Sequence, residues 1–323
     1  MERAVTNESK TERTEPQIPQ KKKKNIKKWI PLYMLAVPGF TYLFINNYLP
    51  LYGMQLAFRK LNYGQGVFSG AFVGLDNFKF LFSTDRGFIM IRNTVLYNLL
   101  FIVVGTVIGI SVAILFNEIR GKLAAKFYQS AVLVPYFMSM VIVSYLGFAY
   151  LSADSGFINN TILKAFGKDP VTWYSEPGYW PFILLFINTW KGIGYSLLMY
   201  SARMISFDPA YYEAATIDGA TKWQQIRHIT LPMLKPAIVM MSILSIGRMF
   251  YSDFGLFYQI PMNSGPLYNI TTTIDVYSFR ALMNLGDISM ASATGVFQSA
   301  VGFVLLTIAN LTVRRISKDD ALF

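Results

Sequence analysis

The chain has 323 residues, of which 53% are hydrophobic, 16% aromatic and only 15% charged, and its net charge is +11. This composition is too apolar for an ordinary soluble domain of this length, so the bilayer is the expected solvent. The absence of cysteine excludes disulfides, thiolate metal sites and cysteine nucleophiles, and the single histidine, His228, leaves little room for a histidine metal cluster.

The chain begins with a polar and basic tail, residues 1–28. This tail is rich in Glu, Thr, Gln and Lys, with lysine at every position of 21–24, and it offers almost nothing to bury. We expect it to be disordered and cytoplasmic, and to anchor the orientation of the first span. Its basic run could instead bind anionic lipid or nucleic acid. Because the positive charge is shared between the tail and the short loops, a role in membrane orientation explains it better, and we expect no nucleic-acid partner.

Six apolar segments are long enough to cross the hydrocarbon layer as helices, which takes about 20 residues. In chain order they cover residues 29–48, 91–116, 127–151, 179–205, 237–257 and 291–313. With both termini in the cytoplasm, and with Arg92 and Arg203 at the span ends counted with the adjoining loops, the inside segments hold 19 lysines and arginines and the outside segments hold 8, as the positive-inside rule requires. The sequence therefore predicts an all-α polytopic membrane protein with a six-helix domain over 29–313 and a cytoplasmic tail over 314–323.

Two segments on the predicted outer side are long, residues 49–90 and 253–290. Each mixes polar and aromatic residues with glycines and prolines, so we expect folded caps or partner-docking surfaces there. Within the second span, Gly105 and Gly109 have the GxxxG spacing that lets two helices approach closely. That spacing indicates packing and is not specific to a function.

The cytoplasmic segment 207–232, between the fourth and fifth spans, is predicted to form two short helices. Asp208 is a suitable N-cap, and Pro209 a suitable first helical residue. Gly219 can end the first helix, where a side chain would obstruct the turn. One face of that helix carries Tyr211, Ala214, Ala215 and Asp218.

The second of these helices is predicted from a capping box. Thr221 with Gln224 has the spacing of a capping box at its start, and Leu231 with Pro232 is expected to end it near the membrane. Taken alone, these features are equally typical of an amphipathic hairpin lying on the membrane surface.

The same segment carries a more specific pattern. It resembles the EAA loop of the inner-membrane subunits of binding-protein-dependent ABC importers through Glu213, Ala214, Ala215, Gly219, Ile229, Leu231 and Pro232. Other stretches resemble the carbohydrate branch of that family: "FVGLDNFKFLF" at 72–82, Asn93 with Thr94, "WKGIGYSLLMY" at 190–200, and "GVFQSAVGFVLLTIANLTVRRIS" from 295. The resemblance covers most of the chain beyond residue 28, and within the branch it is greatest for permeases of oligosaccharides from polysaccharide breakdown.

The resemblance implies that segment 207–232 is a coupling helix seated in a groove of a cytoplasmic ATPase, whose closure drives alternating access. Glu213 would bond to the ATPase, Ala214 and Ala215 would permit close approach, and Gly219 would provide the turn. Three further residues would hold the shape of the loop: Asp218, Leu231 and Pro232.

The resemblance also implies a multi-pass location in a bacterial cytoplasmic membrane and a set of partners. These are a second homologous permease subunit, two cytoplasmic ATPase subunits, an extracytoplasmic substrate-binding protein, an oligosaccharide and membrane lipid. The sequence has no GxxxxGK[ST] run to hold phosphates, so ATP and Mg²⁺ are expected on the ATPase subunits. No paired catalytic groups stand out, and the chain is not expected to be an enzyme or to bind a cofactor.

Ionisable residues inside the spans suggest a substrate pathway. Lys191 and Arg248 lie within the predicted fourth and fifth spans, where a charge must face a polar cavity or a partner. Both could pair with the carboxylates of a uronic-acid oligosaccharide, or could simply make contacts between helices or subunits. Polar and aromatic residues suited to sugar hydroxyls and ring faces lie at comparable depth: Asn188, Trp190, Tyr195, Tyr251, Asp253 and Gln298.

Other functions remain open at this stage. An ion channel or secondary transporter would explain the spans and buried charges but not the EAA spacing, and we find no clear internal repeat of the kind that many secondary transporters carry. A membrane enzyme would need a catalytic constellation. Within the importers, an amino-acid, peptide or metal substrate is the alternative, because the coupling loop does not contact the substrate.

Overall fold

The computed structural model describes residues 30–316, except 63, 65 and 120. The chain divides into two units, Met1–Tyr52 and Gly53–Phe323. In the first unit, α1 (Ile30–Leu43) is followed by the π-helical turn η2 (Phe44–Tyr48). The predicted first span is therefore helical over its described part, while the tail at 1–28 and most of the tail at 314–323 lie outside the described residues.

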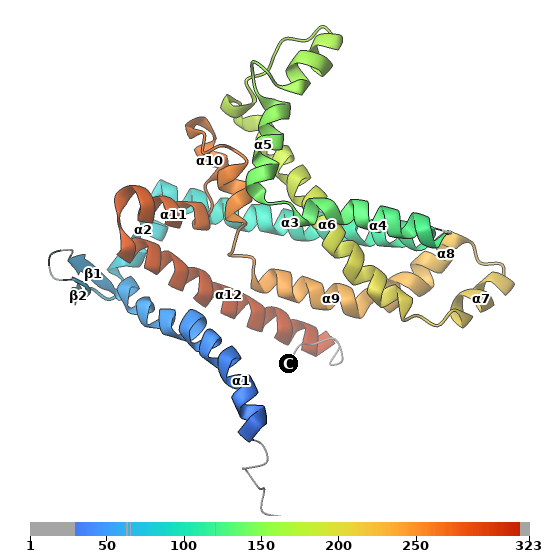
Figure 1. Ribbon diagram of the computed structural model, residues 1–323, viewed down its shortest axis with the longest axis horizontal. Coiled ribbons are helices and arrows are strands. Elements are labelled where there is room, and N and C mark those ends of the chain that lie inside the picture. Colours follow the sequence, from blue (N-terminus) through green and yellow to red (C-terminus); the bar gives the residue numbers. More distant parts are fainter. Residues whose placement is uncertain (1–29, 63, 65, 120, 317–323) are drawn as a thin grey trace, which may run out of the picture. The chain divides into compact units, whose positions relative to one another are not determined.

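The rest of the described chain is mainly helical (Figure 1). After η3 (Leu49–Phe58) come β1 (Arg59–Asn62), β2 (Gly66–Phe72), η4 (Asp76–Phe78), α2 (Lys79–Ser83), α3 (Asp85–Asn117), α4 (Lys122–Phe137), α5 (Met140–Leu151), η5 (Ile158–Leu163), η6 (Trp173–Ser175), η7 (Pro177–Tyr179), α6 (Trp180–Ile205), α7 (Ala210–Ile217), α8 (Lys222–Gln225), η8 (Ile226–Thr230), α9 (Leu231–Gly247), η9 (Gly255–Gln259), η10 (Gly265–Leu267), α10 (Tyr268–Thr271), α11 (Ile274–Leu285) and α12 (Ile288–Ile316).

The expectation of an all-α fold is corrected by one small sheet. Strands β1 and β2 pair antiparallel, with Arg59 opposite Phe72 and Lys60 opposite Ala71. Gly70 allows the close approach, because a Cβ there would collide with the Lys60 carbonyl. The Asn77 side chain, in the segment "FVGLDNFKFLF", donates to the Arg59 carbonyl at 2.9 Å. The predicted outer segment 49–90 is thus folded.

Four described helices are long and apolar enough to cross a membrane: Asp85–Asn117, Pro177–Ile205, Lys222–Gly247 and Ile288–Arg315. They correspond to the predicted second, fourth, fifth and sixth spans. The number rises to five if the sharply bent pair of α4 and α5 is counted as one span. The polytopic helical fold is therefore confirmed, whereas six spans remain a prediction.

The predicted third span is wrong as a single helix. α4 and α5 are bent by 96° at a short break. Pro135, in the last turn of α4, has no N–H to donate, Met138 is extended, and the Ser139 hydroxyl accepts from the Val141 N–H at 3.3 Å to start α5. A proline followed by a serine N-cap therefore divides a run that is uniformly apolar.

The predicted fifth span, 237–257, ends early. α9 stops at Gly247, and the chain then turns and has no regular secondary structure over residues 251–253. Distant side chains satisfy the backbone groups released there. The Ser252 N–H donates to Asp275 Oδ2 at 2.7 Å, and the Phe250 carbonyl accepts from Gln298 Nε2 at 2.8 Å. Tertiary hydrogen bonds thus end the helix inside an apolar run.

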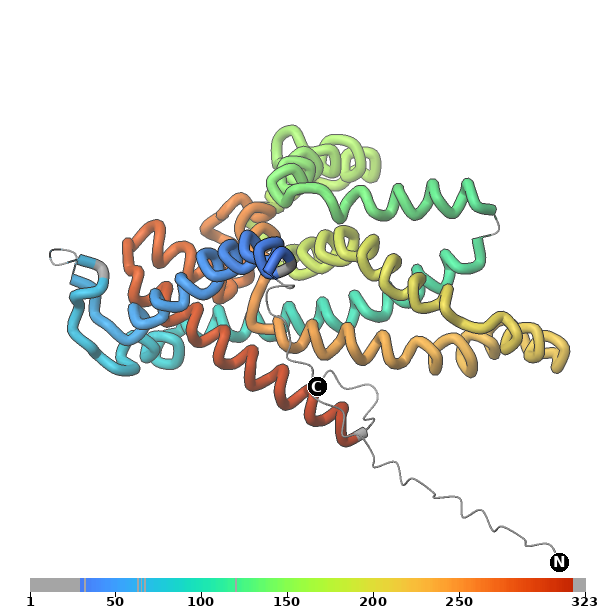
Figure 2. Tube along the Cα trace, turned by 60° about the horizontal axis from the view of Figure 1, so that its bottom comes forward, coloured from blue at the N-terminus to red at the C-terminus, as the bar shows by residue number. Residues whose placement is uncertain are grey.

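α3 packs along α6, α6 also packs against α4, and α12 packs against α9 and α11 (Figures 1 and 2). The GxxxG pair contributes at one position. A Cβ on Gly109 would lie 2.7 Å from Ser196 Cβ on α6, whereas a Cβ on Gly105 would meet no described atom within 4 Å. Gly109 therefore permits close packing of α3 on α6. Gly105 has open space where its side chain would be.

The spans keep large apolar side chains on their surface. Phe182 and Phe186 of α6 and Phe303 of α12 are examples, each about 70% exposed or more. Apolar surface on this scale would drive association in water. The bilayer and partner subunits are the surroundings that can cover it.

Candidate functional site

The segment after α6 folds as a helical hairpin, named here the coupling hairpin (residues 207–232). It consists of the short helix α7 and the first turns of the helix that runs from Lys222 to Gly247. At its start the Asp208 carboxylate accepts from the Ala210 N–H at 2.9 Å. Asp208 thus caps α7, although the helix begins at Ala210, one residue later than predicted.

Gly219 makes the turn of the hairpin in a left-handed conformation, with φ of +77°. Its N–H donates to the Thr216 carbonyl at 3.1 Å, and the next N–H, of Ala220, donates to the Ala215 carbonyl at 2.9 Å. These two bonds form a Schellman motif, which satisfies carbonyls at the end of α7. The predicted helix end is confirmed. A Cβ at Gly219 would meet no described atom within 4 Å, so the left-handed φ, and not the predicted obstruction, is the reason for glycine.

The capping box at the start of α8 is also confirmed. The Thr221 N–H donates to Gln224 Oε1 at 2.7 Å, and the Gln224 N–H donates to Thr221 Oγ1 at 3.4 Å. The predicted end of this helix at Leu231 with Pro232 is wrong, because helix continues from Lys222 to Gly247. The π turn η8, closed by the Leu231 N–H on the Ile226 carbonyl, precedes the proline, which sits in the first turn of α9, where it is tolerated.

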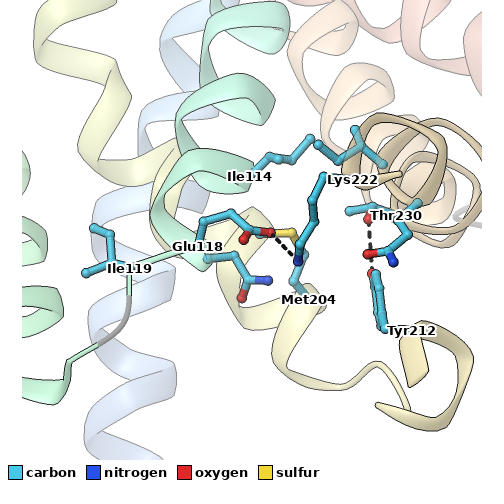
Figure 3. Close-up of a pocket in the computed structure, with 10 residues that line it drawn as sticks. Ile114, Glu118, Ile119, Met204, Tyr212, Lys222 and Thr230 are labelled. Carbon is cyan, nitrogen blue, oxygen red and sulfur yellow. Dashed lines mark hydrogen bonds and ion pairs between the residues drawn. The ribbon is translucent and has the colours of Figure 1, made fainter. Parts of the chain in front are cut away.

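Side-chain contacts hold the two arms of the coupling hairpin together and tie the hairpin to the end of α3 (Figure 3). The Tyr212 hydroxyl and Thr230 Oγ1 lie 3.0 Å apart and join α7 to η8. Lys222 Nζ lies 3.3 Å from Glu118 Oε1 at the end of α3. Both of these charged side chains are more than half exposed, so the pair contributes at most about 1 kcal/mol. A cavity of about 280 Å³ lies between these contacts.

The hairpin presents an uncovered surface away from the rest of the described chain. Of the residues predicted to act at the ATPase, Glu213, Ala214 and Gly219 are exposed and Ala215 is half-buried, and the predicted shape-holding Asp218 is also exposed. Sequence reasoning missed two large apolar side chains beside them, Ile217 at 87% and Trp223 at 67% exposure. Apolar residues in an otherwise polar loop were the available signal.

A second candidate region runs between α3, α6 and α9. Two adjoining cavities share the residues Phe101, Ile102, Asn188 and Ser245. The hairpin-side cavity measures about 240 Å³ and the distal cavity about 450 Å³. The polar residues that line them, named here the polar stripe, are Asn98, Thr106, Tyr136, Asn188, Thr189, Tyr195, Ser196, Tyr200, Ser245, Arg248, Tyr251, Ser252 and Asp253.

The polar stripe follows helical faces. On α3 the lining residues recur at 98, 101, 102, 105 and 106, and on α9 and the residue that follows it at 241, 245 and 248. These are spacings of three and four residues, as along one helical face. The Thr189 hydroxyl is buried and has no hydrogen-bond partner in the described chain. A water or substrate hydroxyl in the hairpin-side cavity is a suitable partner for it.

The cavities bring five predicted pathway residues together. Asn188 lines both cavities, Tyr195 lines the hairpin-side one, and Arg248, Tyr251 and Asp253 line the distal one. Among the described residues Arg248 makes no ion pair, so its charge is available to a ligand.

The other three predicted pathway residues lie elsewhere. Trp190 faces a separate, mainly apolar cavity of about 650 Å³ beside α5. Lys191 Nζ donates to the Tyr136 carbonyl at 2.9 Å and so caps α4 where it breaks. Gln298 is buried and holds the Phe250 carbonyl. For Lys191 this placement favours the alternative of a contact between helices, and Gln298 likewise holds a neighbouring element.

Sequence reasoning missed Asp275, in the first turn of α11. Its carboxylate accepts from the Ser252 N–H and from Gln298, at the rim of the distal cavity. Burial raises the pKa of this carboxyl, and these hydrogen bonds oppose the shift. The residue holds the irregular segment 251–253, which carries Asp253. An isolated acidic residue far along the chain gave no signal of this role.

Comparison with known proteins places these features in context. Residues 105–318 match the family described as binding-protein-dependent transport system inner membrane component. The polygalacturonan/rhamnogalacturonan transport system permease protein YteP of Bacillus subtilis strain 168 is 32% identical over 289 residues, covering 89% of each chain.

Two crystal structures of a bacterial ABC transporter for alginate are also similar, each with a TM-score of 0.82 and coverage of 91% of this chain and 98% of theirs. One holds a periplasmic protein bound to an alginate pentasaccharide and is 32% identical. The other is described as importing the acidic polysaccharide alginate and is 31% identical.

Proposed function

Since the chain belongs to the family of binding-protein-dependent transport system inner membrane components, we propose that its coupling hairpin transmits ATPase closure to the helices that carry the polar stripe. The chain is a membrane permease subunit of a carbohydrate importer, as its relatives are sugar permeases. ATP and Mg²⁺ are held by two cytoplasmic ATPase subunits, and this chain supplies the membrane path.

The exposed surface of the coupling hairpin is the observation that carries this proposal. Ile217 and Trp223 expose apolar area that a partner must cover, while Glu213 and Asp218 place negative charge beside them. α7 contains no lysine or arginine, whereas helices that lie on anionic membranes carry them. These features favour a basic groove on a protein over a lipid surface.

The polar stripe is the proposed path of the sugar. Amide, hydroxyl and tyrosine groups offer the hydrogen bonds that sugar hydroxyls need, and the distal cavity of about 450 Å³ has the size of a small-ligand site. The substrate is an oligosaccharide released from a polysaccharide, as the names of the relatives suggest. An amino-acid or peptide substrate is not favoured.

The assembly completes the path. A second, homologous permease covers the open side of the polar stripe and part of the exposed apolar surface of the spans. Six spans with both termini in the cytoplasm place the coupling hairpin at the ATPases and segments 49–90 and 253–290 outside. There they meet an extracytoplasmic binding protein.

The hairpin surface is tested by Ile217→Asp in the complex reconstituted in lipid. Ile217 is 87% exposed, so the fold tolerates the change, while loss of its burial in a groove weakens ATPase binding by about 10- to 150-fold. Leu123→Asp is the matched control. Leu123 is 85% exposed and lies in the first turn of α4, close in sequence to Glu118, which contacts the hairpin, but Leu123 itself is outside the hairpin.

The measurements are co-purification of the ATPase subunits and sugar-stimulated ATP hydrolysis. Ile217→Asp is expected to lower both, and Leu123→Asp neither. A complex that keeps its ATPase and its sugar stimulation with Ile217→Asp would show that the hairpin is only a membrane-surface element.

A further inference from the structure

A cavity of about 370 Å³ lies at the end of α3 opposite to the coupling hairpin. Arg86 at the start of α3 lines it, whereas Glu118, which contacts the hairpin, follows the end of α3. A helix of this length separates the two sites by about 50 Å. The cavity, named here the arginine pocket, is lined among others by Arg86, Tyr268, Asn269, Tyr277, Arg280 and Asn284.

Arg280 is held rigidly by neutral partners. Its Nε and Nη2 donate to Asn263 Oδ1 at 3.2 and 2.7 Å, and its Nη1 donates to Thr272 Oγ1 at 2.9 Å. The guanidinium also lies 3.8 Å from the centre of the Tyr268 ring. These contacts use three of its five N–H groups, so the group is preorganised and still has donors to offer.

The charge of Arg280 is uncompensated. Ion pairs among the described residues are Lys79 with Asp76 and Lys222 with Glu118, so no carboxylate in this part of the chain pairs with the guanidinium. Burial lowers the pKa of Arg280, which means that desolvation disfavours its charge. A half-buried cation without an anion gains strongly from a ligand that brings one.

A second cation enters the same pocket. Arg86 is exposed and has no hydrogen bond or ion pair in the described structure. Arg86 is close enough to Tyr277 to act on it electrostatically. Burial raises the pKa of the Tyr277 hydroxyl, and the positive charge of Arg86 opposes this shift. The nearby Asp287 carboxylate accepts from the Met290 N–H at 2.8 Å. Two guanidinium groups thus face one cavity with no anion between them.

We propose that the arginine pocket binds the carboxylate of a uronic-acid unit as an acidic oligosaccharide approaches the permease. The cavity falls in the size range of small-ligand sites and exceeds what one acidic side chain of a partner protein needs. Its tyrosine and asparagine side chains suit a sugar ring. The proposal rests on the sugar-import function above and names the acidic class of its substrate, to which alginate belongs.

The test compares a labelled short oligogalacturonate with its fully methyl-esterified form, which keeps the rings and loses the charge. Binding is measured to the complete permease and ATPase complex in lipid, without the binding protein. Arg280→Gln is expected to weaken binding of the acidic form about tenfold or more, and Arg86→Gln about two- to fivefold. Binding of the ester is expected to be unchanged.

Two further variants separate charge from structure. Arg280→Lys keeps the charge and is expected to bind the acid better than Arg280→Gln does. A merely structural role would make both variants equally poor for both sugars, and that result would overturn the proposal. Lys168→Gln makes the same charge change outside the pocket on an exposed residue and is expected to have no effect.

Two more measurements distinguish a sugar site from a protein-docking site and the pocket from the import function. If Arg280→Gln weakens association of the sugar-free binding protein, the pocket holds a protein carboxylate and the proposal is overturned. Sugar-stimulated ATP hydrolysis by the native complex tests the import function separately. Stimulation together with binding that ignores the carboxylate would leave the importer standing and refute the arginine pocket, whereas neither stimulation nor binding would refute both.

Discussion

Replacing Gly109 by alanine is expected to strain the contact between α3 and α6, whereas the same change at Gly105 is not. The new Cβ at 109 would lie 2.7 Å from Ser196 Cβ and 3.2 Å from Ser196 Oγ, while ordinary contacts begin at 3.4 Å. A Cβ at Gly105 meets no described atom within 4 Å. The two glycines occupy equivalent helical positions one turn apart, so each is the control of the other.

The expected magnitude follows from two opposing terms. Relief of the contact requires a helix shift of about 0.7 Å, and overpacking of this kind costs about 1–3 kcal/mol. Alanine also gains about 1 kcal/mol over glycine in a helix, equally at both positions. The difference between the two variants is therefore the contact term alone, which corresponds to about 2–6 °C in unfolding temperature.

Thermal unfolding of the purified complex measures this difference. Ser196→Gly removes the side chain that the new Cβ would meet, at the cost of a glycine inside α6. When both alanine variants also carry Ser196→Gly, this cost cancels and the difference between them is expected to vanish, which is the rescue. Equal unfolding temperatures for the two alanine variants, or no rescue by Ser196→Gly, would refute the assigned packing of α3 on α6.

Two further predictions concern the hairpin turn and the buried acid. Gly219→Ala is expected to speed hydrogen exchange at the Ala220 amide by about 5- to 30-fold, because a Cβ in the left-handed region costs about 1–2 kcal/mol. Gly219→Asn is expected to speed it much less, and equal rates would contradict the Schellman turn. Burial raises the pKa of Asp275, so the stability contributed by its protonated form is complete below about pH 4 and falls as the pH rises through the folded-state pKa. Asp275→Asn is expected to remove that fall in unfolding temperature, and parallel pH profiles would show that the carboxyl does not titrate with folding.

The coupling hairpin could be predicted from the sequence because its determinants are local. Asp208 caps its own helix, Gly219 closes the Schellman motif over six residues, and Thr221 and Gln224 cap each other. The mistaken end at Pro232 arose because a proline was expected to stop a helix. In the structure Pro232 directly follows the π turn η8 and lies in the first turn of α9, where a proline hardly destabilises a helix.

The polar stripe could be predicted only in part. Asn188, Tyr195 and Arg248 were found because polar residues in apolar spans attract attention, but Asn98 and Ser245 passed unnoticed at the same helical spacing. Trp190 and Lys191 adjoin Asn188 in sequence and yet leave the stripe. Neighbours along a helix point in directions about 100° apart, so depth in a span does not determine which cavity a side chain faces.

The sequence by itself determined the solvent, the principal helices and the coupling hairpin, because transfer free energy and capping act over short windows. Only the tertiary structure decided where the apolar runs stop being helix. Ser252 is held by Asp275, 23 residues away, Phe250 by Gln298, 48 residues away, and the end of α4 by Lys191, which is 55 residues from Tyr136. A backbone that leaves its helix inside an apolar environment must find hydrogen-bond partners on other elements, and a hydropathy window contains no information about groups so far away along the chain.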